Sequence, residues 1–284
     1  MEPFSLTQCQ SINEDKFRKL RRDEYLMEPK IDGWRMQVDV DDGDVTAWTR
    51  TRHKATGKLV MPERILSEFN TTRMRLDGEV VYLDSNGKPD YNFTARCLGS
   101  GVDVCVDKQM EDGKFLTYMV FDILFLQGQD LRDTPFAYRR GLLVDVLHDI
   151  NPYVSVVEVE EPSIENHSKF IEQYGEGSVL KVLSSSYAGK RHKSWLKWKA
   201  EETIEVRIIG YKDGQGKFAG LIGAIEFRAA DGTIGNCSGM DDEMRVWISN
   251  HREELKGTVI EVKHYGRLVD GFRHPQFVRL RADK

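Results

Sequence analysis

The stretch Lys30-Ile31-Asp32-Gly33-Trp34-Arg35 decides how the rest of the chain is interpreted. It places a lysine, an acid, a glycine and an arginine within one turn. A lysine becomes a nucleophile only when its ammonium group loses a proton, so we expect nearby cations or burial to lower its pKa. Gly33 allows backbone conformations closed to other residues and a close approach to a ligand. Taken alone, the six residues fit an exposed, charged turn better than a nucleophilic site.

The composition is that of an ordinary globular protein. The chain has 284 residues, 40% of them hydrophobic and 31% charged, which is enough for two compact domains with real cores. It contains no run of about 18 apolar residues, and Met1 to Ser5 lacks the pattern of a secretory signal. The four cysteines are scattered: Cys9, Cys97, Cys105 and Cys237. This spacing argues against a zinc module or a disulfide framework and predicts a cytoplasmic, intracellular protein.

The charge balance permits a nucleic-acid partner without proving one. The net charge of −5 is unusual for a protein that binds phosphates, but net charge does not fix the sign of a single cleft. Basic residues cluster at residues 50–54, 190–199 and 273–281. Each cluster on its own fits a solvated face, and each lies beside one of the motifs described below.

Periodicity predicts two domains that differ in secondary-structure content. Residues 35–40 alternate and, with Val45 to Thr49, predict a hairpin; Ser11 to Arg22 and Met61 to Phe69 predict helices. After residue 202 the chain changes to short strands separated by glycine turns, with a single helix at 241–255. That pattern favours a small Greek-key barrel of the oligonucleotide-binding (OB) type. We expect an α+β protein with domains at 1–202 and 203–284.

Five further motifs follow Lys30 in a fixed order: Leu76-Asp77-Gly78-Glu79, Phe121-Asp122-Ile123-Leu124, Glu176-Gly177-Ser178-Val179-Leu180-Lys181, Trp195-Leu196-Lys197-Trp198-Lys199, and the basic ending Arg273 to Lys284. Each motif is weak alone. The ordered set resembles the covalent nucleotidyltransferases, in particular the small ATP-dependent DNA ligases of bacteriophages and large DNA viruses. The resemblance extends from Glu28 to Lys284. It implies an ATP-grasp-like nucleotidyltransferase domain of antiparallel sheets flanked by helices, followed by an OB-fold barrel.

The resemblance implies a covalent mechanism centred on Lys30. This lysine is expected to attack the α-phosphorus of ATP and to carry AMP as a lysyl-adenylate. Lys197 and Lys199 lie two residues apart, hence on one face of a strand. They are expected to neutralise the α-phosphate and to lower the pKa of Lys30.

The family's nucleotide contacts carry over residue by residue. Glu79 is expected to accept a hydrogen bond from the ribose, and Phe121 to stack on adenine, with Val179 or Leu180 on the other ring face. Glu28 matches the position that reads the adenine amino group and would select ATP over GTP. The nucleotide-binding set expected in the first domain is Glu28, Lys30, Arg35, Glu79, Phe121, Val179, Lys181, Lys197 and Lys199.

Two acids are the expected metal ligands. Glu176 resembles the family's metal-site acid, and carboxylate oxygens suit Mg²⁺. Asp32 is expected close to the reacting phosphates, where it acts through the metal or through water. The predicted cofactors are therefore ATP and Mg²⁺.

Arginines are the expected contacts to DNA. Arg35 and Arg50 are predicted to bind phosphate at the nick, and Arg52 competes with Arg50 for that role. Four residues of the last motif are expected to orient the departing pyrophosphate: Arg273, Arg279, Asp283 and Lys284. They could act only if the second domain closed over ATP and later swung away.

The predicted reaction is the sealing of nicks with a 5′-phosphate and a 3′-hydroxyl in duplex DNA by a monomer. Only 29 residues precede Lys30, so we expect no separate N-terminal DNA-binding domain. Two alternatives stay open. An RNA ligase or an mRNA-capping enzyme would share the first motif, and a non-catalytic barrel protein would bind nucleic acid without chemistry.

Overall fold

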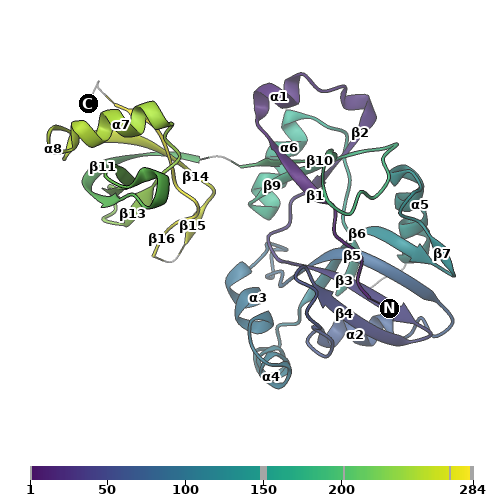
Figure 1. Ribbon diagram of the computed structural model, residues 1–284. Helices are drawn as coiled ribbons and strands as arrows, with labels where there is room; N and C mark the ends of the chain where they lie inside the picture. Colours follow the sequence, from purple (N-terminus) through teal and green to yellow (C-terminus); the bar gives the residue numbers. More distant parts are fainter. Residues whose placement is uncertain (1, 148–151, 201, 269, 282–284) are drawn as a thin grey trace. The chain divides into compact units, whose positions relative to one another are not determined.

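The computed structural model describes residues 2–147, 152–200, 202–268 and 270–281 (Figure 1). The chain forms two compact units, Met1–Lys199 and Ala200–Lys284. The proposed domain boundary after residue 202 lies close to this division, in the first residue of the strand β11, which begins at Glu202. Among the described residues, no helix is long and apolar enough to cross a bilayer.

A four-stranded sheet in the first unit has the order β1-β10-β9-β2. Its strands are β1 (Gln8–Ile12), β10 (Arg191–Lys199), β9 (Gly177–Val182) and β2 (Tyr25–Pro29). β1 runs parallel to β10, and the other pairs are antiparallel. Helices α1 (Glu14–Arg18) and α6 (Ile164–Tyr174) cover one face of this sheet, where Phe17 and Phe170 are buried (Figure 1).

The second sheet of this unit has the order β4-β3-β5-β6-β7, and β8 pairs with β6. Its strands are β4 (Asp44–Thr49), β3 (Trp34–Asp41), β5 (Arg73–Val81), β6 (Thr117–Leu126), β7 (Gln129–Asp130) and β8 (Val154–Val156). The remaining elements are α2 (Val60–Leu66), α3 (Tyr91–Leu98), α4 (Val102–Asp112), α5 (Phe136–Leu147) and a 3₁₀ turn at Arg22–Glu24.

The core of the first unit follows from the alternation of β3, β5 and β6. Val38, Leu76 and Ile123 are fully buried in one cluster with residues of α2 to α5. Burying one such side chain contributes about 1.5–3 kcal/mol. The predicted hairpin at 35–49 is confirmed by the pairing of β3 with β4.

Two expectations for the first unit are corrected. The predicted helix at Ser11 to Arg22 is wrong, because Ser11 and Ile12 belong to β1 and pair with β10. Only Glu14–Arg18 is α-helical, capped by the side chain of Asn13. Helices α3 and α4 were not predicted at all, although Asp90 caps α3 by accepting from the Phe93 amide at 2.9 Å.

Two buried ion pairs stabilise the second sheet, one between its strands β3 and β5 and one between β6 and the helix α5. Arg75 donates to Asp39, and Arg139 of α5 donates to both carboxylate oxygens of Asp122 at 2.7 and 2.9 Å. Arg139 and Asp122 have no exposed side-chain surface. Since unpaired buried charges are costly, each partner depends on the other.

The second unit is a five-stranded antiparallel sheet of order β13-β12-β11-β14-β17 beside a two-stranded β15-β16 ribbon. Its elements are β11 (Glu202–Asp213), β12 (Ile222–Arg228), β13 (Ile234–Cys237), α7 (Asp242–Asn250), α8 (Arg252–Leu255), β14 (Val259–His264), β15 (Arg267–Leu268), β16 (Gly271–Phe272), β17 (Gln276–Leu280) and a 3₁₀ turn at Gly216–Phe218. This arrangement is consistent with the predicted OB barrel, with the expected helix divided between α7 and α8.

Candidate active site

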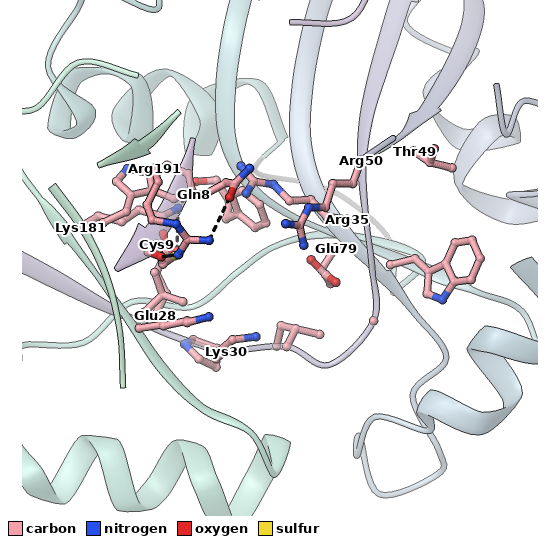
Figure 2. Close-up of a pocket in the computed structure, with 18 of the residues that line it drawn as sticks. Gln8, Cys9, Glu28, Lys30, Arg35, Thr49, Arg50, Glu79, Lys181 and Arg191 are labelled. Atoms are coloured by element: carbon pink, nitrogen blue, oxygen red, sulfur yellow. Dashed lines mark hydrogen bonds and ion pairs between the residues drawn. The ribbon is translucent and has the colours of Figure 1, made fainter. Parts of the chain in front are cut away.

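A pocket of about 500 Å³ lies between the two sheets of the first unit (Figure 2). Strands β1, β2, β9 and β10 contribute one wall, and β3, β4, β5 and β6 contribute the other. Nine predicted site residues line it: Glu28, Lys30, Arg35, Arg50, Glu79, Phe121, Val179, Lys181 and Lys197. The fold therefore brings most of the predicted nucleotide-binding set to one place.

The backbone around Lys30 explains why the first motif has its spacing. Lys30 follows the end of β2, where its amide donates to the Gly177 carbonyl at 2.8 Å. Gly33 leads into β3 so close to β5 that a Cβ atom there would lie 2.3 Å from the Val80 carbonyl oxygen. Only glycine fits this approach, so Gly33 fixes the position of Lys30 relative to β5.

The Lys30 ammonium is held by an acid. Its Nζ lies 2.6 Å from Glu176 Oε2, and Lys199 Nζ lies 2.8 Å from Glu176 Oε1. Burial lowers the pKa of Lys30, but the Glu176 carboxylate opposes this, and the pKa of Lys30 ends above its usual value. The expectation of a lowered lysine pKa is therefore wrong for this state of the site. Lys30 must part from Glu176 before its amine can attack.

Lys197 and Lys199 of β10 differ in their surroundings. Lys197 lines the pocket, and burial together with the Lys199 and Lys30 charges lowers its pKa. Trp198, between them, points to the opposite face and stacks between Phe17 and His167, with ring centroids 4.5 and 3.6 Å away. This stack fixes β10 and with it both lysines.

His167 makes the stability of this stack depend on pH. Burial lowers the pKa of His167 to about 4, and its Nδ1 lies 2.8 Å from the Ser178 hydroxyl. An unfolded histidine titrates near 6.5. Its folded pKa is depressed, so the stabilisation is complete above about pH 6.5 and is lost as the pH falls towards 4. We expect a loss of up to about 3 kcal/mol from this residue at pH 4.

The check is denaturant unfolding of wild type and His167→Gln between pH 7 and pH 4. Wild type is expected to lose stability faster than the variant over this range, because only wild type carries the imidazole. Parallel pH profiles for the two proteins would contradict the assignment.

At the inner end of the pocket, Glu28 and Lys181 form a buried ion pair of 2.7 Å. The Lys181 ammonium also donates to the Phe121 carbonyl at 3.2 Å and lies 4.2 Å from the Trp195 ring centroid. Burial raises the pKa of Glu28, and Lys181 opposes the rise. Among the described residues, Glu28 Oε1 has no hydrogen-bond partner. A buried acceptor without a donor is a position for a ligand.

Arg35 is more constrained than the sequence predicts. It donates to both oxygens of Asp77 at 3.1 and 2.7 Å, to the Thr7 carbonyl at 2.6 Å and to the Tyr187 hydroxyl at 3.2 Å. The Tyr187 hydroxyl donates to Asp77 at 2.6 Å. These bonds leave one of the five guanidinium donors for a phosphate. Arg35 therefore acts mainly as a fixed part of the wall.

Glu79 lines the pocket from β5, where its backbone lies opposite Arg35 of β3 in the strand register. Burial raises its pKa to about 8, against the pull of Lys30 and Arg35. Burial thus favours the protonated form of this carboxyl group. It can therefore both donate and accept a hydrogen bond.

Three predicted residues lie beside the pocket lining rather than in it. Glu176 contacts the pocket residue Lys30, and Lys199 contacts Glu176, as described above. Asp32 follows Lys30 in the turn before β3 and is not among the described lining residues. Glu176 therefore lies directly against Lys30, with Lys199 on its other carboxylate oxygen, and Asp32 lies two residues further along the chain.

Arg50 and Arg52 differ in what they contact. Arg50 lines the main pocket and a neighbouring one of about 230 Å³, and it has no hydrogen-bond or ion-pair partner among the described residues. Arg52 lines only the neighbouring pocket and donates to the Ser5 hydroxyl at 2.7 Å. The geometry thus favours Arg50 over Arg52 as a phosphate contact.

The expected pyrophosphate contacts lie in the second unit. Arg279 donates to Glu261 at 2.7 Å, and the Arg273 carbonyl accepts from the Tyr265 amide at 3.0 Å. Asp283 and Lys284 lie outside the described residues.

Several lining residues were not predicted. Gln8 and Cys9 come from β1, and Arg191 from the start of β10 donates to the Cys9 carbonyl at 2.6 Å. No local sequence pattern predicts these residues, because β1 pairs with a strand some 180 positions further along the chain. The basic cluster at 190–199 was the one visible hint of Arg191.

Comparison with known families agrees with this geometry. The sequence model described as "ATP dependent DNA ligase domain" matches residues 4–199, which include both sheets and the pocket. The chain belongs to the ATP-dependent DNA ligase family. Members of this family use ATP.

Curated relatives carry ligase names. The chain is 31% identical over 278 residues to a probable DNA ligase of Streptomyces avermitilis, covering 90% of this chain and 54% of that protein. It is 30% identical over 197 residues to the multifunctional non-homologous end joining protein LigD of Pseudomonas aeruginosa, covering 69% and 22%. The chain thus spans about half the length of the first of these relatives and less of the second.

Solved structures share the fold. A Lig E DNA ligase superposes with a TM-score of 0.71 at 21% identity, covering 98% of this chain and 99% of that one. The ligase domain of Mycobacterium tuberculosis LigD gives 0.59 at 22% identity, covering 98% and 94%. This confirms the predicted α+β architecture of antiparallel sheets and helices.

Proposed function

We propose that this chain seals 5′-phosphate/3′-hydroxyl nicks in duplex DNA with ATP, as a monomer. The observation that carries the proposal is the position of Lys30: its amine lies in a nucleotide-sized pocket beside two acids and the β10 lysines. All the residues that line this pocket come from the first unit.

The reaction proceeds in three group transfers. The Lys30 amine, after losing its proton, attacks the α-phosphorus of ATP; the N–P bond forms and pyrophosphate leaves. The 5′-phosphate of the nick then attacks the same phosphorus, which frees Lys30 and produces an adenylated DNA end. Finally the 3′-hydroxyl attacks the 5′-phosphate and AMP leaves. Throughout, the protein positions groups and neutralises charge.

Nucleotide selection follows from the inner end of the pocket. The free Oε1 of Glu28 would accept a hydrogen bond from the adenine amino group, whereas guanine presents an oxygen at that position. Phe121 and Val179 would take the two faces of the base, and Glu79 the ribose. Lys197 faces the α-phosphate, where a cation stabilises the charge that develops during attack.

A magnesium ion fits this site only if the protein and the bound nucleotide both supply its ligands. The described residues contain no cluster of three or more side chains that could hold a metal. Mg²⁺ commonly binds one or two carboxylates together with substrate phosphates, and Glu176 and Asp32 supply oxygens of that kind. Once bound, the ion would neutralise phosphate charge. Because Glu176 holds both Lys30 and Lys199, a ligand that drew on its oxygens would weaken its hold on Lys30.

Arg50 is the proposed contact to the 5′-phosphate of the nick, since its guanidinium has no partner among the described residues while Arg52 donates to Ser5. A charge-assisted hydrogen bond contributes about 1.5–3 kcal/mol. Arg50→Ala is therefore expected to slow nick sealing about 10- to 100-fold while self-adenylation stays within about threefold of wild type. Arg52→Ala is the matched control and is expected to have the smaller effect.

Single-turnover sealing of a nicked duplex by pre-adenylated protein measures this step separately. A larger loss in Arg52→Ala than in Arg50→Ala would reverse the assignment.

The function itself is tested by incubating the chain with ATP, Mg²⁺ and a nicked duplex that carries a labelled 5′-phosphate. A sealed strand is expected, and the same nick without the 5′-phosphate should stay open. Failure to seal any phosphorylated nick, under conditions in which the chain is folded, would contradict the proposal.

A further inference from the structure

A second groove, of about 620 Å³, lies on the opposite face of the β1-β10-β9-β2 sheet from the nucleotide pocket. Along β10, Trp195 and Lys197 face the nucleotide pocket, while Ser194 and Leu196 line the groove. This alternation is that of a strand with one side chain on each face in turn. Because the two cavities are separated by the sheet, both can be occupied at once.

The rim of the groove is basic. Lys16 and Lys19 reach it from α1 and its C-terminal end, and Lys193 with His192 from the start of β10. The three lysines are exposed, and within the described part of the chain their ammonium groups have no hydrogen-bond or ion-pair partner. The one acid of the lining, Glu24, is already paired with Arg21 at 2.8 Å. The rim therefore has a net positive charge available to a ligand.

The floor of the groove is apolar. It is formed by the side chains of Ile12, Leu20, Tyr25, Val182 and Leu196. A duplex would place only its phosphates on such a surface and would leave this floor uncovered. A single strand can turn its bases inward onto aromatic and aliphatic side chains while its phosphates stay at a basic rim.

We propose that this groove binds a short unpaired segment of nucleic acid, with phosphates at Lys16, Lys19 and Lys193 and a base on Tyr25. Its volume is within the roughly 300–1,000 Å³ typical of sites for small organic ligands, so it accommodates a nucleotide-sized group. The apolar floor distinguishes this occupant from a duplex backbone, and the three exposed ammonium groups at the rim match a phosphate chain.

The test measures binding of the full chain to a labelled twelve-residue thymidine oligonucleotide by fluorescence anisotropy. Replacing Lys16, Lys19 and Lys193 with alanine is expected to weaken binding at least about tenfold. It is also expected to lower the slope of log affinity against log salt by about two, at roughly 0.7 per lost phosphate contact. The control variant replaces three lysines outside the groove: Lys88, Lys108 and Lys169. Tyr25→Leu is expected to weaken binding at least about fivefold.

Two further ligands, an abasic oligonucleotide and polyglutamate, distinguish a groove that binds bases from one that binds only charge. An abasic oligonucleotide of the same length is expected to bind at least about tenfold more weakly, and polyglutamate to compete poorly. Equal binding of the abasic strand, equal competition by polyglutamate, or equal affinity of the groove variant and its control would each overturn the proposal. Self-adenylation with ATP should be unchanged in the groove variant, which separates this site from the nucleotide pocket.

Discussion

Replacing Lys30 with alanine is expected to reduce self-adenylation and the sealing of an ordinary phosphorylated nick to background, a loss of about 10⁴-fold or more. The same variant is expected to seal a nick that already carries AMP. The first step needs the Lys30 amine as the nucleophile, whereas in the last step the DNA hydroxyl is the nucleophile and Lys30 carries no bond. No other lysine can substitute readily, because Gly33 and the Gly177 carbonyl fix the backbone position of Lys30.

The matched control is Lys169→Ala, which removes an exposed lysine paired with Glu160 on the surface of α6. It should keep all three steps. Equal loss of both activities in Lys30→Ala, in a protein that unfolds like wild type, would mean that Lys30 is not the nucleophile.

Replacing Asp122 with alanine is expected to destabilise the first unit by about 3–5 kcal/mol. The change leaves the Arg139 guanidinium buried with no carboxylate, although it still reaches the Thr134 carbonyl at 2.6 Å. Asp122 follows Phe121 on β6, so a loosened β6 would also disturb the base-binding wall. The measurement is denaturant unfolding monitored by tryptophan fluorescence.

An exposed ion pair at the end of β7 serves as the control. Arg132 and Asp130 are also joined by an ion pair, at 2.6 Å, but their side chains are 40% and 47% exposed. Asp130→Ala is expected to cost less than about 1 kcal/mol, because solvent screens an exposed pair. Similar losses for the two variants would show that burial of the Asp122 pair is not what makes it important.

The sequence predicted which residues line the pocket better than it predicted the contacts between them. Lys30, Glu79 and Lys197 could be found because each belongs to a short local pattern. The contact between Glu176 and Lys30, which raises rather than lowers the lysine pKa, joins residues 146 positions apart. No local pattern reports such a contact. The carboxylate was expected to bind metal, and the structure shows that it binds two lysines.

The errors in secondary structure have a similar cause. β1 is short and polar, and its partner β10 lies far along the chain, so residues 11–22 were interpreted from their charges as a helix. Pairing with β10, rather than intrinsic propensity, makes this segment a strand. The N-terminal segment then supplies Gln8, Cys9 and the Thr7 carbonyl to the site. No pattern in its sequence predicts this contribution.

The most direct test of the central claim is incubation with ATP or GTP labelled at the α-phosphate, with Mg²⁺, followed by denaturing electrophoresis. Label from ATP alone is expected to stay on the protein, on the peptide that contains Lys30, and to move to the 5′ end of a nicked duplex when unlabelled DNA is added. Label from GTP would contradict the role of Glu28 and favour a capping activity. No label from either nucleotide would contradict covalent catalysis by Lys30.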